Sequence, residues 1–103
     1  MKLEDKIRMN SLYDIYGKLL TEKQRMYYEY YYLSDYSLSE ISEILSVSRN
    51  AVHMQLKNVV NHLENYEKTL KMLEKKKKIN SLINQIEKKK ISLENIKKQL
   101  EKV

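Results

Sequence analysis

The sequence predicts an all-α fold, and three observations lead to that class. The 103 residues include no proline and one glycine, so the chain has little suitable material for strand ends, bulges or tight turns. Apolar residues recur at steps of three and four along most of the chain, as one face of a helix requires. Two capping boxes mark helix starts within the first half of the sequence.

The first two helices are predicted at residues 5–20 and 22–33. One face of the first helix carries the apolar side chains Met9, Leu12, Tyr13, Tyr16, Leu19 and Leu20. Thr21 and Gln24 then form a T-x-x-Q capping box, which predicts that the second helix starts at Glu22. That helix is expected to end near Leu33, where a polar stretch follows.

Residues 26–37 hold six of the nine tyrosines, five in the second helix and Tyr36 in the loop that follows it. At 100° per residue, the side chains of this helix form two stripes on opposite sides. The predicted core stripe consists of Tyr27, Tyr28, Tyr31 and Tyr32. The opposite stripe consists of Met26, Tyr30 and Leu33, and we expect it to lie in a dimer or partner interface. Stacking of the rings on nucleic-acid bases is the alternative use.

A helix-turn-helix is predicted at residues 37–63. Ser37 and Glu40 form a second capping box, and the buried side of the short helix is expected to carry Leu38, Ile41, Ile44 and Leu45. Residues 46–48 form the link, and Ser48 is placed to cap a longer helix that begins at Arg49. The apolar stripe of the longer helix is Val52, Leu56, Val59, Val60 and Leu63. Ser46 replaces the glycine common in this turn, at a cost on the order of 1 kcal/mol.

Two apolar seams follow that are out of phase with each other. The first is Leu63, Tyr66, Leu70 and Leu73; the lysine run at 75–78 interrupts it. The second fits a heptad with Lys89 as its one polar d position, and its apolar members are interface candidates: Ile79, Leu82, Ile86, Leu93, Ile96 and Leu100. We expect a bend or break near the lysine run, with the last helix either folding back or pairing with a second chain. The domains are therefore predicted at 1–74, the helix-turn-helix domain, and 75–103, a basic amphipathic tail.

Positive charge is concentrated at the C-terminal end. Residues 1–65 hold eight Lys or Arg and nine Asp or Glu, whereas residues 66–103 hold twelve Lys and five Glu. A basic tail is an electrostatic footprint for RNA, DNA or an acidic surface, although a solvated charged helix has the same composition. The nucleic-acid-binding candidates in the tail are Lys75, Lys76, Lys77 and Lys78.

The start of the longer helix carries candidates for contacts with duplex DNA. Arg49, Asn50 and His53 are placed for base edges and Lys57 for a phosphate, and Arg and Asn suit guanine and adenine respectively. A protein that makes about 6–10 phosphate contacts needs more positive charge than this domain holds. DNA binding therefore stays one possibility, and use of the motif as a packing module is favoured.

The sequence lacks the residues that several classes of function require. Without cysteine there is no disulfide, thiolate metal site or cysteine nucleophile. The two histidines, His53 and His62, do not share a helix face, and no carboxylate cluster or Gly-rich phosphate loop accompanies them. We therefore expect no enzyme activity, no metal and no cofactor. With no secretion signal and no long apolar run, a cytoplasmic protein without membrane insertion is expected.

The stretch LTEKQRMYYEYYYLSDYSLSEISEILSVSRNAVHMQL resembles region four of bacterial sigma factors, in its L-T-x-x-Q-R opening and V-S-R-x-A-V entry to the second helix of the motif. Residues 8–73 more closely resemble the YlxM family of small bacterial helix-turn-helix proteins; the D-Y-S-L-S-E-I segment is the most specific part. The resemblance implies a dimeric, cytoplasmic accessory or regulatory protein of the signal recognition particle pathway. Its implied partners are the particle's RNA, its GTPase or both.

Two further functions stay open at this point. One is a dimeric transcription regulator that reads DNA with its helix-turn-helix. The other is an adaptor whose helices engage a protein. Salt separates the adaptor from both kinds of nucleic-acid binding, because the release of counterions makes the affinity for nucleic acid fall steeply as salt rises.

Overall fold

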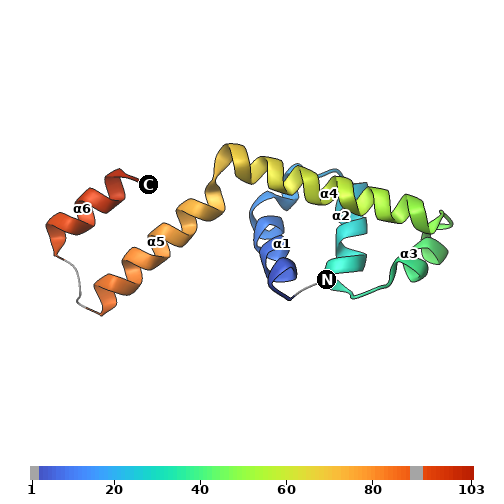
Figure 1. The fold of residues 1–103 in the computed structure, drawn as a ribbon, viewed down its shortest axis with the longest axis horizontal. Helices are drawn as coiled ribbons and strands as arrows, with labels where there is room; N and C mark the ends of the chain where they lie inside the picture. The colour runs from blue at the N-terminus through green and yellow to red at the C-terminus, as the bar shows by residue number, and fades with distance from the viewer. Residues whose placement is uncertain (1–2, 89–91) are drawn as a thin grey trace. The chain divides into compact units, whose positions relative to one another are not determined.

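The structure is a computed structural model that describes residues 3–88 and 92–103, and helices account for most of them (Figure 1). The helices are α1 (Leu3–Tyr16), α2 (Glu22–Tyr28), α3 (Leu38–Leu45), α4 (Arg49–Leu70), α5 (Met72–Glu87) and α6 (Leu93–Glu101). A 3₁₀ turn, Gly17–Leu19, follows α1, and a π-helical turn, Glu29–Leu33, follows α2. No strand occurs among the described residues, so the predicted all-α class is confirmed.

The chain divides into two compact units, Met1–Leu70 and Lys71–Val103. The first unit holds α1 to α4 and the second holds α5 and α6. This division falls a few residues before position 74, where the sequence places the end of the helix-turn-helix domain.

The first unit is organised around α4, which contacts α1, α2 and α3 (Figure 1). Its core matches the predicted apolar stripes at most positions. The buried side chains are Met9, Leu12, Tyr16, Leu20, Tyr27, Tyr28, Tyr32, Ile41, Val52, Leu56, Val59 and Leu63. Two predicted core positions are wrong: Leu19 is 55% exposed and Ile44 is 50% exposed. Leu19 ends the 3₁₀ turn, where the 3.6-residue spacing of α1 no longer holds, and Ile44 lies in the last turn of α3.

The tyrosine-rich segment begins and ends where the sequence predicts, but its last turn is not α-helical. Thr21 accepts a hydrogen bond from the Gln24 amide and Gln24 reaches back to the Thr21 amide, which completes the capping box. At the other end, the Ser34 amide donates to the Glu29 carbonyl at 2.8 Å, five residues back. A π turn spaces side chains at less than 100°, so a regular helical wheel is less accurate after Tyr28, although Tyr32 is buried as predicted. Tyr31, predicted to be in the core, is only half-buried.

The buried tyrosine rings stack on one another. Tyr28 lies between Tyr13 and Tyr32, with ring centroids 4.1 Å and 4.5 Å apart and nearly parallel planes. The Tyr28 hydroxyl donates to Asn10 and the Tyr13 hydroxyl to Glu29. Offset stacking of this kind contributes about 0.5–1.5 kcal/mol per pair beyond the burial of area. Tyr28 and Tyr32 are therefore core rings rather than a platform for bases.

The second unit begins at a sharp break in the helix. Lys71 has a φ of 54°, in the left-handed region, and α5 starts directly after it. The predicted break near the lysine run is thus confirmed, but it lies four residues before the run, and residues 75–78 themselves lie inside α5. Lysine is a good helix former, so a run of four does not by itself end a helix. The left-handed residue at position 71 interrupts the helix instead.

The last helix folds back onto α5, one of the two arrangements that the sequence left open. The N-terminus of α6 is capped by Ser92, whose hydroxyl accepts a hydrogen bond from the Asn95 amide at 3.3 Å. The predicted heptad is consequently split between two helices, and its polar d position, Lys89, lies outside the described residues. Of its apolar members, Leu82 is buried and Ile96 half-buried, whereas the exposed ones are Ile79, Ile86, Leu93 and Leu100.

Candidate nucleic-acid interface

The turn between α3 and α4 has the geometry of a helix-turn-helix. Ser46 has a φ of 54°, so the turn takes the left-handed residue without glycine. The Val47 amide donates to the Ser42 carbonyl and the Ser46 amide to the Glu43 carbonyl, which is the Schellman pattern that ends a helix. The Ser48 hydroxyl then accepts from the Ala51 amide at 3.0 Å and caps α4, as predicted.

The four DNA-contact candidates lie in the first turns of α4. Arg49, Asn50, His53 and Lys57 are all exposed. None of the four forms an ion pair or a side-chain hydrogen bond with another residue in the described part of the chain. Their polar groups are therefore available to a ligand or a partner.

One face of α4 carries a row of asparagine side chains that the sequence patterns above do not identify. Asn50, Asn58, Asn61 and Asn65 are all exposed. At 100° per residue they fall within an arc of about 80°, opposite the buried stripe. The same periodicity test that finds apolar faces would have found this row if it had been applied to amides. Asn can pair with adenine edges, but it adds no charge for phosphate binding.

Three of the eight basic residues described in the first unit are engaged within the unit. Arg8 donates two hydrogen bonds to Glu64, at 2.9 Å and 2.8 Å, and these bonds raise its pKa. Lys6 pairs with Asp35, and Arg25 donates to the Leu20 carbonyl at 2.8 Å. The electrostatic support for binding a duplex is therefore small in this unit, as its composition predicts.

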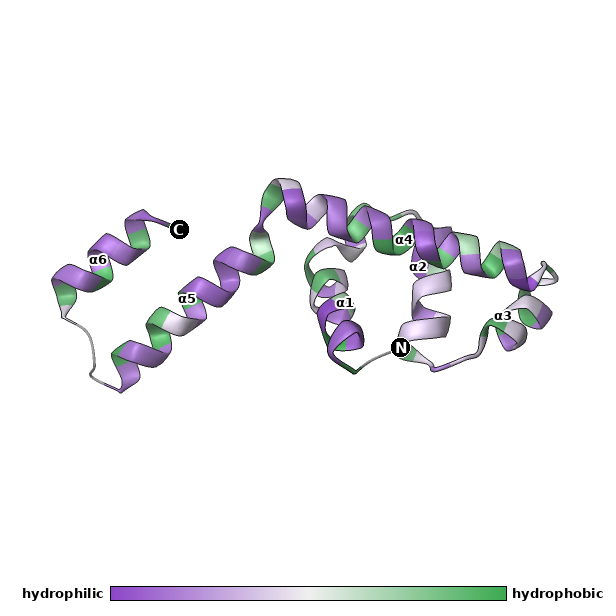
Figure 2. Cartoon of the chain, viewed as in Figure 1, coloured by the Kyte–Doolittle hydropathy of each residue, from purple (hydrophilic) through white to green (hydrophobic). Residues whose placement is uncertain are grey.

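The second unit carries the strongest positive charge. Lys75, Lys76, Lys77 and Lys78 occupy consecutive positions of α5 and are exposed, so they surround one turn of the helix with ammonium groups. Lys78 pairs with Glu74 at 3.5 Å, and the other three form no ion pair within the described residues. Hydrophilic residues cover most of α5 and α6 (Figure 2).

The described residues contain neither a metal-binding cluster nor a membrane-spanning helix. Residues 3–88 and 92–103 hold no group of three or more His, Asp or Glu side chains close enough together to bind a metal ion. No helix in the described part of the chain combines the length and the apolar character needed to cross a membrane.

Comparison with known proteins gives one consistent result. The model of the UPF0122 family, described as YlxM / p13 like helix-turn-helix proteins, matches residues 3–103. The UPF0122 protein of Geobacillus sp. (strain WCH70) is 50% identical over 84 residues, which cover 82% of this chain and 76% of that protein. That of Caldanaerobacter subterraneus is 48% identical over 83 residues, covering 81% and 71%. That of Listeria monocytogenes serotype 4b is 48% identical over 80 residues, covering 78% and 73%.

Proposed function

This chain belongs to the YlxM / p13 like family of helix-turn-helix proteins, and we propose that it is a non-enzymatic accessory protein of the signal recognition particle pathway. In this proposal it acts in the cytoplasm and binds the particle's RNA through its lysine-rich second unit. The particle's GTPase is a further partner. The pathway comes from the resemblance stated above, and the RNA-binding surface from the charge of the chain.

The observation that carries the proposal is the separation of charge between the two units. Eleven of the twenty basic residues lie in the second unit, residues 71–103, with only four acidic residues among them. Ammonium groups bind phosphate oxygens and release counterions, which supplies affinity for RNA without reading its sequence. Lys75, Lys76 and Lys77 are exposed and have no acidic partner in the described residues, so they are the proposed phosphate contacts.

Co-purification from a bacterial extract tests the pathway. The full chain should retain the particle's RNA, its GTPase or both, and the variant Lys75→Gln/Lys76→Gln should lose most of the RNA. The matched control is Lys18→Gln/Lys23→Gln, which removes two exposed lysines from the first unit and should retain the RNA. A bound fraction without either particle component would refute the pathway. Equal loss of RNA in the two variants would refute the role of the lysine run.

Sequence-selective DNA binding by a dimer is the second candidate, and the free side chains at the start of α4 favour it. Arg49, Asn50 and His53 would meet base edges and Lys57 a phosphate. Arg49→Ala should then abolish selectivity between DNA sequences in a binding selection, while Lys68→Ala at the far end of α4 should preserve it. An unchanged DNA preference in Arg49→Ala would exclude this use of the motif.

An adaptor role would show a different response to salt. Nucleic-acid binding weakens steeply as salt rises, whereas a largely apolar protein interface does not. Partner binding that persists in about 0.5 M salt would therefore argue for a protein partner held by apolar contacts.

A further inference from the structure

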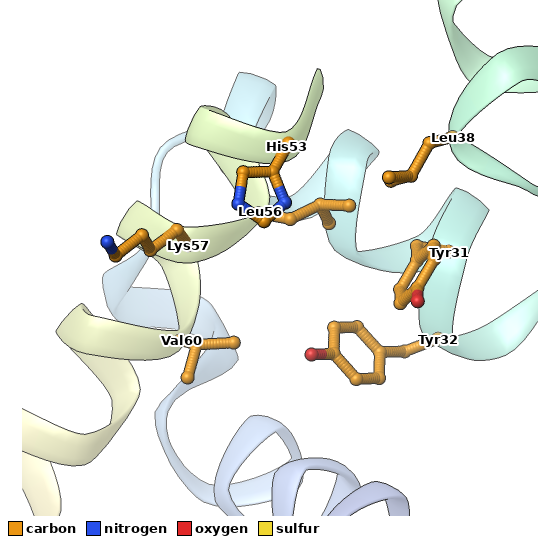
Figure 3. Close-up of a pocket in the computed structure, with 7 residues that line it drawn as sticks. All are labelled: Tyr31, Tyr32, Leu38, His53, Leu56, Lys57 and Val60. Carbon is orange, nitrogen blue, oxygen red and sulfur yellow. The ribbon is translucent and has the colours of Figure 1, made fainter. Parts of the chain in front are cut away.

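One hollow in the first unit combines an apolar wall with polar groups from two directions (Figure 3). It has a volume of about 250 Å³ and lies between the tyrosine-rich segment, the start of α3 and the first turns of α4. Leu38, Leu56 and Val60 supply the aliphatic part of its wall, and Tyr31 and Tyr32 supply two rings that meet edge to face at 5.1 Å. This size is near the lower end for small-molecule pockets, so it suits a ligand with one ring.

The Tyr32 hydroxyl is an unpartnered polar group that faces this hollow. The side chain is only 4% exposed. No hydrogen bond joins its hydroxyl to another residue in the described part of the chain, where no fully buried side-chain oxygen lacks a partner. The hydroxyl is therefore reachable, and Figure 3 shows it pointing into the pocket, toward Val60. Burial, followed by the nearby charges of Tyr31 and Asp5, raises the pKa of Tyr32 to about 12, so the hydroxyl is a donor at neutral pH.

A free cation lies at the α4 rim of the pocket, and Figure 3 shows the ammonium end of Lys57 turned away from the two tyrosine rings. Lys57 and His53 both come from α4, line the pocket and are exposed. Lys57 forms no ion pair with a described residue, and no carboxylate lines the pocket. An anion there would meet an ammonium group without displacing an acidic partner.

We propose that this pocket binds a small aromatic acid that carries one ring. The ring packs between the tyrosines and the aliphatic wall, and a polar ring substituent accepts a hydrogen bond from the Tyr32 hydroxyl. The acid group pairs with Lys57, whose exposed side chain turns toward the pocket when the ligand binds. Because the pocket belongs to the first unit and the proposed RNA contacts to the second, this inference stands or falls independently of the proposed function.

A titration with 4-hydroxybenzoate, followed by amide chemical shifts of the full chain, tests the assignment. A ligand of this size is expected to bind with a dissociation constant on the order of 1 mM, since small ligands gain only a few tenths of a kcal/mol per atom. The shifts should saturate at residues that line the pocket. Benzoate should bind more weakly because it lacks the polar substituent, and 4-hydroxybenzyl alcohol more weakly because it lacks the charge.

Two variants separate the contacts. Lys57→Gln should weaken 4-hydroxybenzoate about fivefold and remove its advantage over the alcohol, whereas Lys68→Gln, an exposed lysine on the same helix, should change neither. Tyr32→Phe keeps the ring and should reduce 4-hydroxybenzoate to the affinity of benzoate. A comparison of the affinities of phenyl phosphate and benzoate, which carry the same ring, shows whether the pocket prefers a phosphate or a carboxylate.

Three results would overturn the proposal. The first is the absence of saturable shifts up to the solubility limit of the probes. The second is equal weakening in Lys57→Gln and Lys68→Gln, which would mean attraction by net charge alone. The third is an unchanged preference for 4-hydroxybenzoate over benzoate in a folded Tyr32→Phe protein. If Tyr32→Phe does not fold, the comparison of Lys57→Gln with Lys68→Gln still tests the proposal. Both lysines are exposed, so neither change should prevent folding.

Discussion

Ser46 holds a conformation that glycine would adopt at lower cost. Its φ of 54° places it in the left-handed region, where the Cβ atom costs on the order of 1 kcal/mol. Its backbone amide nevertheless donates a hydrogen bond to the Glu43 carbonyl, which completes the turn between α3 and α4. The turn is therefore held by its hydrogen bonds and by the packing of the two helices rather than by local preference.

Replacing this serine should stabilise the protein. Ser46→Gly is expected to raise the free energy of unfolding by about 0.5 kcal/mol, because the relief of strain exceeds the added entropy of the unfolded chain. The control is Ser39→Gly within α3, where a helical position should lose about 0.5 kcal/mol. Urea unfolding measures both, and a decrease in stability for Ser46→Gly would contradict the account of the turn.

The stacked tyrosines should make the protein less stable at alkaline pH. The pKa of Tyr32 is raised to about 12 by burial and the nearby charges, and that of Tyr13 to about 12 by burial and its hydrogen bond to Glu29. The unfolded chain loses these protons near its ordinary value of about 10. Stability is therefore fully present below pH 10 and is lost as pH rises from about 10 to 12.

Phenolate absorbance recorded with urea unfolding tests this dependence. Part of the absorbance of the folded protein should appear only as pH approaches about 12, and the urea midpoint should fall over the same interval. Tyr32→Phe should remove part of the late absorbance. Complete titration of all nine tyrosines near pH 10 in a protein that is still folded would contradict the prediction.

Helix starts follow from local hydrogen bonds, which a short sequence can encode. Ser37 accepts a hydrogen bond from the Glu40 amide at 3.0 Å, and the Glu40 carboxylate accepts one from the Ser37 amide at 3.1 Å. Ser37→Ala should lower the free energy of unfolding by about 1 kcal/mol. Ser39→Ala, which removes an exposed hydroxyl inside α3, should leave it unchanged or raise it slightly. Equal effects in urea unfolding would show that the capping box contributes nothing.

Features that depend on packing across the unit were harder to predict than the caps. Both capping boxes and the buried stripe of α4 were predicted because each depends on residues close in sequence. The π turn at Glu29–Leu33 was not, and it leaves Tyr31 half-buried beside the pocket. Lys71 was also missed, because a lysine carries no local signal for a positive φ.

The candidate sites divide in the same way. Exposure of Arg49, Asn50, His53 and Lys57 follows from the apolar stripe beside them, which fixes the buried side of α4. Sequence patterns could not assign Lys57 and Tyr32 to one pocket, since they line the same hollow only after α4 has packed against the tyrosine-rich segment. The pocket therefore required the structure.

The proposed self-association remains a prediction for the assembled protein. Leu33 is 52% exposed and Tyr30 stacks on Tyr36 at 5.4 Å, so the stripe with Met26 has room for a partner. Leu33→Glu should weaken a dimer at least tenfold, because it would bury an unpaired charge. The control is Leu19→Glu, because Leu19 is similarly exposed, at 55%, but lies outside the stripe. Sedimentation equilibrium measures both, and a monomeric parent chain or equal effects of the two changes would contradict this interface.

The salt dependence of RNA binding tests the central claim most directly. For the full chain and the particle's RNA, the logarithm of the affinity should fall linearly with the logarithm of salt. Lys75→Gln/Lys76→Gln/Lys77→Gln should reduce the magnitude of that slope by about 2, and Lys18→Gln/Lys23→Gln should leave it unchanged. A slope that is the same for the parent chain and the triple variant, or no measurable RNA binding at low salt, would contradict the claim that the lysine run binds RNA.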